Sequence, residues 1–159
     1  MKFIAYLIYI VNLKYLSIIK KYYYKLLFKK CGSNLLIYGC ANIKNPQNIT
    51  LGDNCSINDN VYLNGLTKID IGNNVAISAS AMIISTGLNV DEFILSIKSH
   101  NGKGIKIGNN VQVGAGAIIL DGVTIGNNVI VGANSLVAKN ISSNLIVAGV
   151  PAKIIRELK

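Results

Sequence analysis

The residue of this chain best suited to acid–base chemistry is its single histidine, His100. A neutral imidazole titrates near physiological pH, so it can take a proton from an attacking hydroxyl group. His100 lies in segment 86–104, TGLNVDEFILSIKSHNGKG, which interrupts the regular repeat on either side of it. A long excursion from a regular scaffold is usually functional. We therefore predict that His100 is a general base, with a packing or surface role as the alternative.

Other residues of reactive type are few. Asp91 and Glu92, in the same segment, could orient the imidazole or could simply be solvated. Cys31, Cys40 and Cys55 form neither an even disulfide set nor a metal-type spacing, and the last falls on an inward packing position. A zinc centre of the three-histidine type is excluded, because the chain has one histidine. We expect no metal and a reduced compartment.

The elements that must position His100 are read from a six-residue repeat over residues 107–137. An aliphatic residue recurs at every sixth position, and a small or β-branched residue follows it four places later. This period fits neither a helix nor an alternating strand, but it is typical of an all-β solenoid in which each hexapeptide is one short strand and a turn. Three hexapeptides close a triangular coil, so residues 31–149 predict about five stacked coils. The aliphatic positions are Ile107, Val113, Ile119, Ile125, Val131 and Val137.

Both ends of the chain depart from the repeat. Residues 1–30 carry apolar side chains at helical spacing, with lysines and tyrosines interleaved. This pattern predicts a helical cap over the end of the solenoid, or an amphipathic surface that lies on anionic lipid. The uncharged run 3–13 is too short to cross a bilayer and has no small-residue cleavage site, so we expect no secretory signal. Residues 150–159, with Pro151 at the first turn, predict a short C-terminal helix.

Composition narrows the possible partners. Hydrophobic residues make up 51% of the 159 residues and charged residues 14%, which suits strands that all bury one face. The formal net charge of +9 indicates an anionic partner, such as a phosphate-bearing cofactor or a membrane surface. Nucleic-acid binding would need aromatic side chains placed to contact bases, whereas most tyrosines here belong to the apolar pattern of residues 1–30. We expect no nucleic-acid partner.

Residues 107–140, IGNNVQVGAGAIILDGVTIGNNVIVGANSLVAKN, are followed by AGVPAKIIREL. This sequence resembles the C-terminal half of the hexapeptide-repeat acyltransferases, in particular the galactoside and maltose O-acetyltransferases, and the resemblance covers residues 31–159. It implies a left-handed parallel β-helix, although crossovers are generally right-handed. It also implies a homotrimer with acetyl-CoA in a groove between adjacent solenoids.

The resemblance implies roles for individual residues. In the family, a backbone amide at one turn faces the thioester, further positions follow the pantetheine and nucleotide, and basic residues lie near the CoA phosphates. Fixed cations bind phosphates well, with ordinary surface charge as the alternative reading of the basic residues. The matching positions are Gly114 and Ala115 at the turn, Ala133 and Lys139 along the cofactor, and Lys153 and Arg156 near the phosphates.

Acceptor-side residues follow the family less closely. Asn58 matches an asparagine that contacts the sugar in the galactoside branch, with a turn role as the alternative. In that branch the catalytic histidine stands directly after the TG that opens the excursion, where this chain has Leu88 and Asn89. We interpret His100 as the replacement base and Asn89 as a second acceptor contact. Gln112 stands where the family often has tryptophan, which alters the packing beside the acceptor.

Together these features predict an O-acetyltransferase that moves an acetyl group from acetyl-CoA to a sugar hydroxyl of a surface polysaccharide or glycolipid precursor. The reaction needs a base for the hydroxyl and a backbone amide for the oxyanion. The alternatives are a serine- or nucleotide-sugar-type acetyltransferase, or a solenoid scaffold that has lost its base at Leu88. We expect a cytoplasmic protein, with peripheral contact to the inner face of the membrane as a further option.

Overall fold

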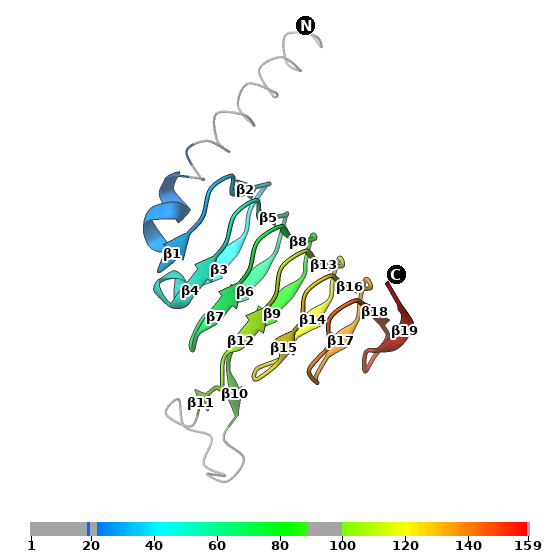
Figure 1. The fold of residues 1–159 in the computed structure, drawn as a ribbon. Coiled ribbons are helices and arrows are strands. Elements are labelled where there is room, and N and C mark those ends of the chain that lie inside the picture. Colours follow the sequence, from blue (N-terminus) through cyan, green and yellow to red (C-terminus); the bar gives the residue numbers. More distant parts are fainter. Residues whose placement is uncertain (1–18, 20–21, 89–99, 159) are drawn as a thin grey trace, which may run out of the picture.

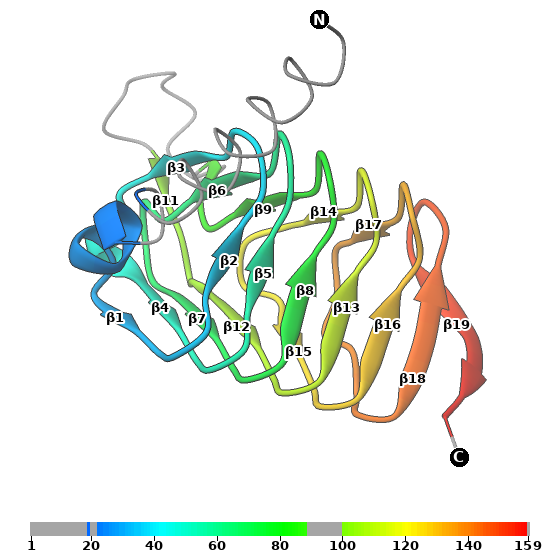
Figure 2. The same cartoon turned by 90° about the horizontal axis from the view of Figure 1, so that it is seen from above.

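A computed structural model describes residue 19, residues 22–88 and residues 100–158. Our predictions for residues 3–13, Asn89, Asp91 and Glu92 lie outside the described residues. The described chain is a triangular solenoid of about five coils, built from three sheets that we call A, B and C (Figures 1 and 2). Their strands are parallel, except for the last strand of sheet B. Successive strands pass from A to B to C and return to A one coil further along.

Each sheet takes one strand from each coil. Sheet A contains β1 (Lys30–Cys31), β4 (Ile49–Leu51), β7 (Ile69–Ile71), β12 (Ile105–Ile107) and β15 (Thr124–Ile125). Sheet B contains β2 (Leu36–Ile37), β5 (Ser56–Ile57), β8 (Val75–Ile77), β13 (Val111–Val113), β16 (Val129–Val131), β18 (Leu145–Ala148) and β19 (Lys153–Glu157). Sheet C contains β3 (Asn42–Lys44), β6 (Tyr62–Asn64), β9 (Met82–Ile84), β14 (Ile118–Ile119) and β17 (Leu136–Val137). A short 3₁₀ helix, η1 (Pro46–Asn48), stands between β3 and β4.

The predicted six-residue period sets both the core and the register. Ile107 pairs with Ile125, and Ile119 pairs with Val137, so each aliphatic position lies beside the one three hexapeptides later. All six predicted positions from Ile107 to Val137 are at most 1% exposed. Cys55 is buried in the same core, as predicted for a packing residue. The aliphatic residues therefore form one continuous apolar column along the axis.

Asparagines shape the corner between sheets A and B. Six of them adopt left-handed backbone angles, with φ between 55° and 62°, a conformation that asparagine tolerates better than most residues. Each side-chain amide donates to the carbonyl oxygen of the next asparagine over 2.8–3.0 Å, which forms an unbroken ladder. The ladder contains Asn34, Asn54, Asn74, Asn110, Asn128 and Asn144. It ties neighbouring coils together on the outside, as the aliphatic column does on the inside.

At the N-terminal end, residues 22–27 are helical and lie beside the first coil (Figure 1). Phe28 is 5% exposed and belongs to the core, while the hydroxyl of Tyr24 donates to the carbonyl of Ala41 over 3.2 Å. These contacts fit the predicted cap. In the part of the chain that the structure describes, no helix is long and apolar enough to cross a membrane.

The predicted C-terminal helix is wrong. After Gly149 (φ +105°) and a cis peptide bond before Pro151, the chain reverses and residues 153–157 form β19, antiparallel to β18. The last coil would otherwise leave the edge of β18 unpaired, and β19 satisfies those backbone groups. The two adjacent isoleucines of KIIRE also suit a strand, because β-branched side chains favour extended backbone.

Candidate active site

The turn between β13 and β14 offers one backbone amide to solvent. The N–H of Gly114 donates to the carbonyl of Val131 over 2.9 Å, so it belongs to the solenoid ladder. The N–H of Ala117 donates to the carbonyl of Gly114 over 3.1 Å, and Gly116 has φ +66°, as in a type II turn. Ala115 is exposed, and its N–H makes no hydrogen bond with any described residue. Of the two residues predicted at this turn, Ala115 is therefore the one whose amide is available to a ligand.

Ala133 lies in the equivalent turn of the next coil. The N–H of Asn134 donates to the carbonyl of Ala115 over 2.8 Å, so the two turns stack directly. A Cβ atom on Gly114 would lie 2.6 Å from the nitrogen of Ala133, so only glycine allows this stacking distance. These turns form the corner between sheets B and C, which we call the B–C edge. The predicted cofactor positions Ala115 and Ala133 thus share one edge of the solenoid.

Asn58 and Gln112 lie near the same edge, and both are engaged within the chain. The side-chain amide of Asn58 donates to the carbonyl of Ile77 over 2.9 Å and so links two neighbouring coils. The side-chain amide of Gln112 donates to the hydroxyl of Ser78 over 2.7 Å. An acceptor molecule at this edge would meet a polar Gln112–Ser78 pair where the family often has an aromatic ring.

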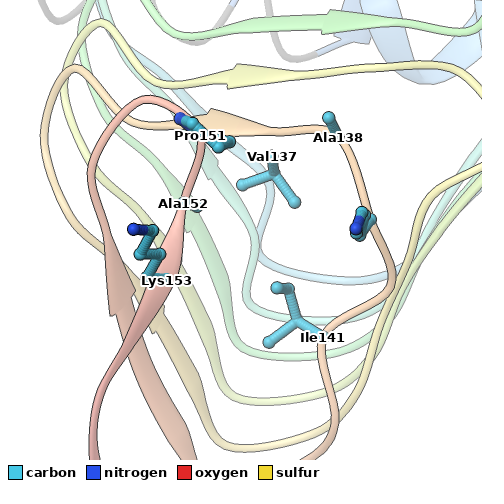
Figure 3. A pocket seen from close by; sticks show the side chains of 7 residues that line it. Val137, Ala138, Ile141, Pro151, Ala152 and Lys153 are labelled. Carbon is cyan, nitrogen blue, oxygen red and sulfur yellow. The ribbon is translucent and has the colours of Figure 1, made fainter.

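The C-terminal end of the solenoid holds a groove of about 210 Å³ (Figure 3). Figure 3 shows Val137 and Ile141 between the stretch that carries Lys153 and the opposite wall. Lys139 lines the same groove, so two of the cations predicted to contact the cofactor, Lys139 and Lys153, come together there. The complete lining is Val137, Ala138, Lys139, Ile141, Pro151, Ala152 and Lys153.

Arg156 does not line this groove, but a β-bulge relates it to Lys153. Residues three apart on a regular strand point to opposite faces. Here the register shifts opposite Ile146 and Val147, so that Lys153 pairs with Ala148 and Arg156 pairs with Ile146. An extra residue in one strand changes the alternation in this way. Lys153 and Arg156 therefore lie on the same, outer face of sheet B.

The excursion leaves the solenoid after β9 and returns at β12, and its two ends pair with each other. Strands β10 (Gly87–Leu88) and β11 (His100–Asn101) are antiparallel, with Leu88 opposite His100 (Figure 1). The predicted base therefore lies beside the position at which the galactoside branch has its histidine. A local sequence reading could not show this register, because residues 89–99 separate the two strands.

Two anchors, which the sequence analysis missed, fix the root of the excursion. The carboxylate of Asp121 accepts hydrogen bonds from the N–H of Lys103, over 2.8 and 3.0 Å, and from the N–H of Gly104, over 2.9 Å. On the departing side, the buried hydroxyl of Ser85 donates to the carbonyl of Asn64 over 2.9 Å. These contacts hold both ends of the excursion against the corner between sheets C and A, which we call the C–A edge.

A basic groove of about 170 Å³ lies next to this root and was also missed. It is lined by Lys68, Lys103 and Lys106, and Lys68 makes a salt bridge with Asp70. Burial raises the pKa of Asp70, but hydrogen bonds from Lys68 and Thr50 and the nearby lysine charges outweigh burial and lower that pKa. The carboxylate therefore stays ionised and compensates part of the lysine charge.

The backbone of His100 and the turn of Ala115 start from different edges of the solenoid. The excursion arises at the C–A edge, whereas Ala115 and Ala133 lie at the B–C edge, and sheet C separates the two edges (Figure 2). The residues predicted for the base and for the thioester therefore lie on two separate edges of the chain.

Comparison with known proteins identifies the family. Residues 104–139 match the model "Bacterial transferase hexapeptide (six repeats)". A protein of Dictyostelium discoideum that is named as an acetyltransferase is 38% identical to this chain over 134 residues. The match covers 84% of this chain and 70% of that protein. The chain belongs to the hexapeptide-repeat acetyltransferases. Galactoside O-acetyltransferase of Escherichia coli is 35% identical over 122 residues, 73% of this chain and 60% of that enzyme.

Solved structures extend the likeness to the fold and the cofactor. A hexapeptide-repeat acetyltransferase from Vibrio cholerae, complexed with acetyl-CoA, superposes with a TM-score of 0.81 at 30% identity, over 86% of this chain and 74% of that one. The β-solenoid predicted from the repeat is confirmed, and so is the left-handed parallel β-helix that the family resemblance implied. This hexapeptide-repeat protein is an acyl-CoA-dependent acetyltransferase. Among the described residues, no group of three histidine, cysteine or acidic side chains could hold a metal ion.

Proposed function

We propose that this acetyltransferase transfers an acetyl group from acetyl-CoA to a hydroxyl of a sugar acceptor, within a surface polysaccharide or glycolipid precursor. The observation that carries the proposal is the pairing of Leu88 with His100. Opposed residues of an antiparallel pair have Cα atoms about 4.5–5.5 Å apart. A histidine from the far end of the excursion thus reaches the neighbourhood that a histidine from its near end occupies in the galactoside branch.

The chemistry follows from these positions. The imidazole of His100 takes the proton of the sugar hydroxyl, whose oxygen attacks the thioester carbonyl. The N–H of Ala115 stabilises the oxyanion of the tetrahedral intermediate. When the carbon–sulfur bond breaks, the imidazolium returns its proton to the leaving CoA sulfur. The products are an acetyl ester and free CoA thiol, and the base is regenerated.

A homotrimer would assemble this site. A closed ring places the C–A edge of each chain beside the B–C edge of the next, and gives every junction the same residues. Acetyl-CoA would then run along Ala115 and Ala133 toward Lys139, Lys153 and Arg156. This path ends in fixed cations, which suits the phosphates of the cofactor. We further propose a cytoplasmic location, where acetyl-CoA is available.

The test is thiol release from acetyl-CoA with a panel of mono- and oligosaccharides, serine and nucleotide sugars, with product mass as a second readout. We expect release that depends on a sugar, and a loss of about 10²–10⁴-fold in turnover for His100→Asn, the usual contribution of a general base. CoA affinity should stay unchanged in this variant. Preferred acetylation of serine, or equal turnover by His100→Asn and wild type, would refute the proposal.

A further inference from the structure

The helical residues near the N-terminus have two unlike faces. Tyr24 and Phe28 face the solenoid, where their rings stack with centroids 6.1 Å apart. The opposite side is apolar and uncovered: Tyr22 is 66% exposed and Leu26 is 87% exposed. At 100° per residue, Ile19 falls on this uncovered side as well, and it is 56% exposed. A row of large apolar side chains therefore points away from the protein body.

Charge around this row is of one sign. Residues 1–52 contain eight lysines and no acidic residue, and the first acidic residue of the chain is Asp53. Lys25, Lys29 and Lys30, which follow or flank the row, are all exposed. The eight lysines are Lys2, Lys14, Lys20, Lys21, Lys25, Lys29, Lys30 and Lys44. Half of the 16 basic residues thus lie in the first third of the sequence, which also contains the exposed apolar residues.

We propose that this face, formed by Ile19, Tyr22 and Leu26 and flanked by lysines, docks on an anionic lipid bilayer. An apolar row with lysines beside it matches an interface that is hydrocarbon inside and negatively charged outside. Tyrosine suits the boundary, because its ring is apolar and its hydroxyl is polar. A second copy of the chain is a poorer occupant, since docking two such faces would bring the lysines of both together.

Docking in this way would fix how the enzyme stands on the membrane. The helical residues lie at the N-terminal end of the solenoid, whereas β19 ends the opposite, C-terminal end (Figure 1). The face that meets the lipid is therefore separate from the groove of Lys139 and Lys153. Docking leaves the cofactor end open to solvent and holds the catalytic body close to lipid-linked acceptors. The acceptor part of this inference rests on the proposed function, while the docking itself does not.

The experiment is co-sedimentation of the full chain with vesicles of phosphatidylcholine alone or mixed with phosphatidylglycerol. We expect binding only to the anionic vesicles, and weaker binding at higher salt. Leu26→Glu should reduce binding by roughly tenfold or more. The pair Lys25→Gln and Lys29→Gln should reduce binding by about thirtyfold, because each lysine near an anionic surface contributes a factor of about five. Ile154→Ser, which removes an exposed isoleucine at the other end of the solenoid, is the matched control and should bind as wild type does.

Leu26→Glu should leave acetyl transfer to a water-soluble sugar unchanged. This activity therefore tests the proposed function separately from membrane docking. Equal binding of Leu26→Glu and wild type would overturn the inference, as would equal binding to neutral and anionic vesicles. Vesicle-free self-association that is lost in Leu26→Glu would assign the face to a second copy and would also overturn it.

Discussion

The carboxylate of Asp121 should matter for turnover although it lies outside the predicted chemistry. It accepts hydrogen bonds from the backbone N–H groups of Lys103 and Gly104. These two residues lie three and four positions after His100 in the sequence. A hydrogen bond to a charged group contributes about 1.5–3 kcal/mol when buried. Asp121 is only partly buried, so water can replace part of each interaction. We take about 1 kcal/mol per amide, and about 2 kcal/mol for Asp121→Ala.

Losing the hydrogen bonds of Asp121 should loosen the root of the excursion and, with it, the pairing of Leu88 with His100. A change of 2 kcal/mol corresponds to a factor of about thirty, which is the upper limit for the fall in turnover. The Michaelis constant for acetyl-CoA should stay near normal, because Ala115 and Ala133 lie at a different edge. The acid limb of the pH–rate profile should remain, since the base itself is retained. Hydrogen exchange at the amide of Ile105 should accelerate.

Asp53→Ala is the matched control for this experiment. Its carboxylate also accepts a backbone hydrogen bond, from Ser33 over 2.7 Å, but at the corner between sheets A and B. This variant should keep wild-type turnover. Wild-type turnover in Asp121→Ala, or an equal fall of turnover and CoA affinity, would refute a positioning role.

Three further predictions concern the Cys55 thiol, the Lys153–Arg156 pair and the Asp53 carboxylate. Burial raises the pKa of the Cys55 thiol, so iodoacetamide should modify the exposed Cys40 of the native protein and reach Cys55 only after unfolding, as peptide mass mapping would show. Replacing Lys153 and Arg156 with alanine should weaken the binding of CoA by about tenfold or more. The binding of dephospho-CoA should weaken by less, because this ligand has fewer phosphate contacts to lose. If calorimetry finds the same CoA affinity in the double variant and the wild type, neither residue contacts the phosphates. Hydrogen bonds from the backbone and side chain of Ser33 lower the pKa of Asp53, so its stabilisation is present above the unfolded-state pKa and is lost as pH falls through the lower folded-state value. Asp53→Asn should therefore flatten the decline of unfolding free energy with acid, and an unchanged slope would contradict this.

The repeat made the fold predictable from sequence, because each hexapeptide carries its own inward residue and corner. The burial of Ile107, Val113 and Ile119 could be predicted from their spacing alone, without any information on distant contacts, and the structure confirms it. The corner asparagines are similarly local, since their left-handed angles are a property of the residue type.

Features that depend on distant partners could not be predicted. The run KIIRE has too few residues to separate a helical from a strand pattern, and its state is decided by the free edge of β18. The pairing of Leu88 with His100 depends on a register that no local pattern encodes. Asp121 reads as an ordinary turn residue in LDG, and only the fold shows that Lys103 and Gly104 return to it.

The most direct test of the central claim is subunit complementation. His100→Asn removes the base, and Ala115→Pro removes the free N–H at a turn position that accepts proline. Ala79→Pro, in the equivalent turn one coil earlier, controls for folding. Each variant alone should be nearly inactive in acetyl transfer. Co-assembled in equal amounts, about three quarters of the trimers are mixed and each has one intact junction of three, so about a quarter of wild-type turnover should return. A co-assembled mixture that stays inactive would contradict a site shared between the C–A edge of one chain and the B–C edge of the next.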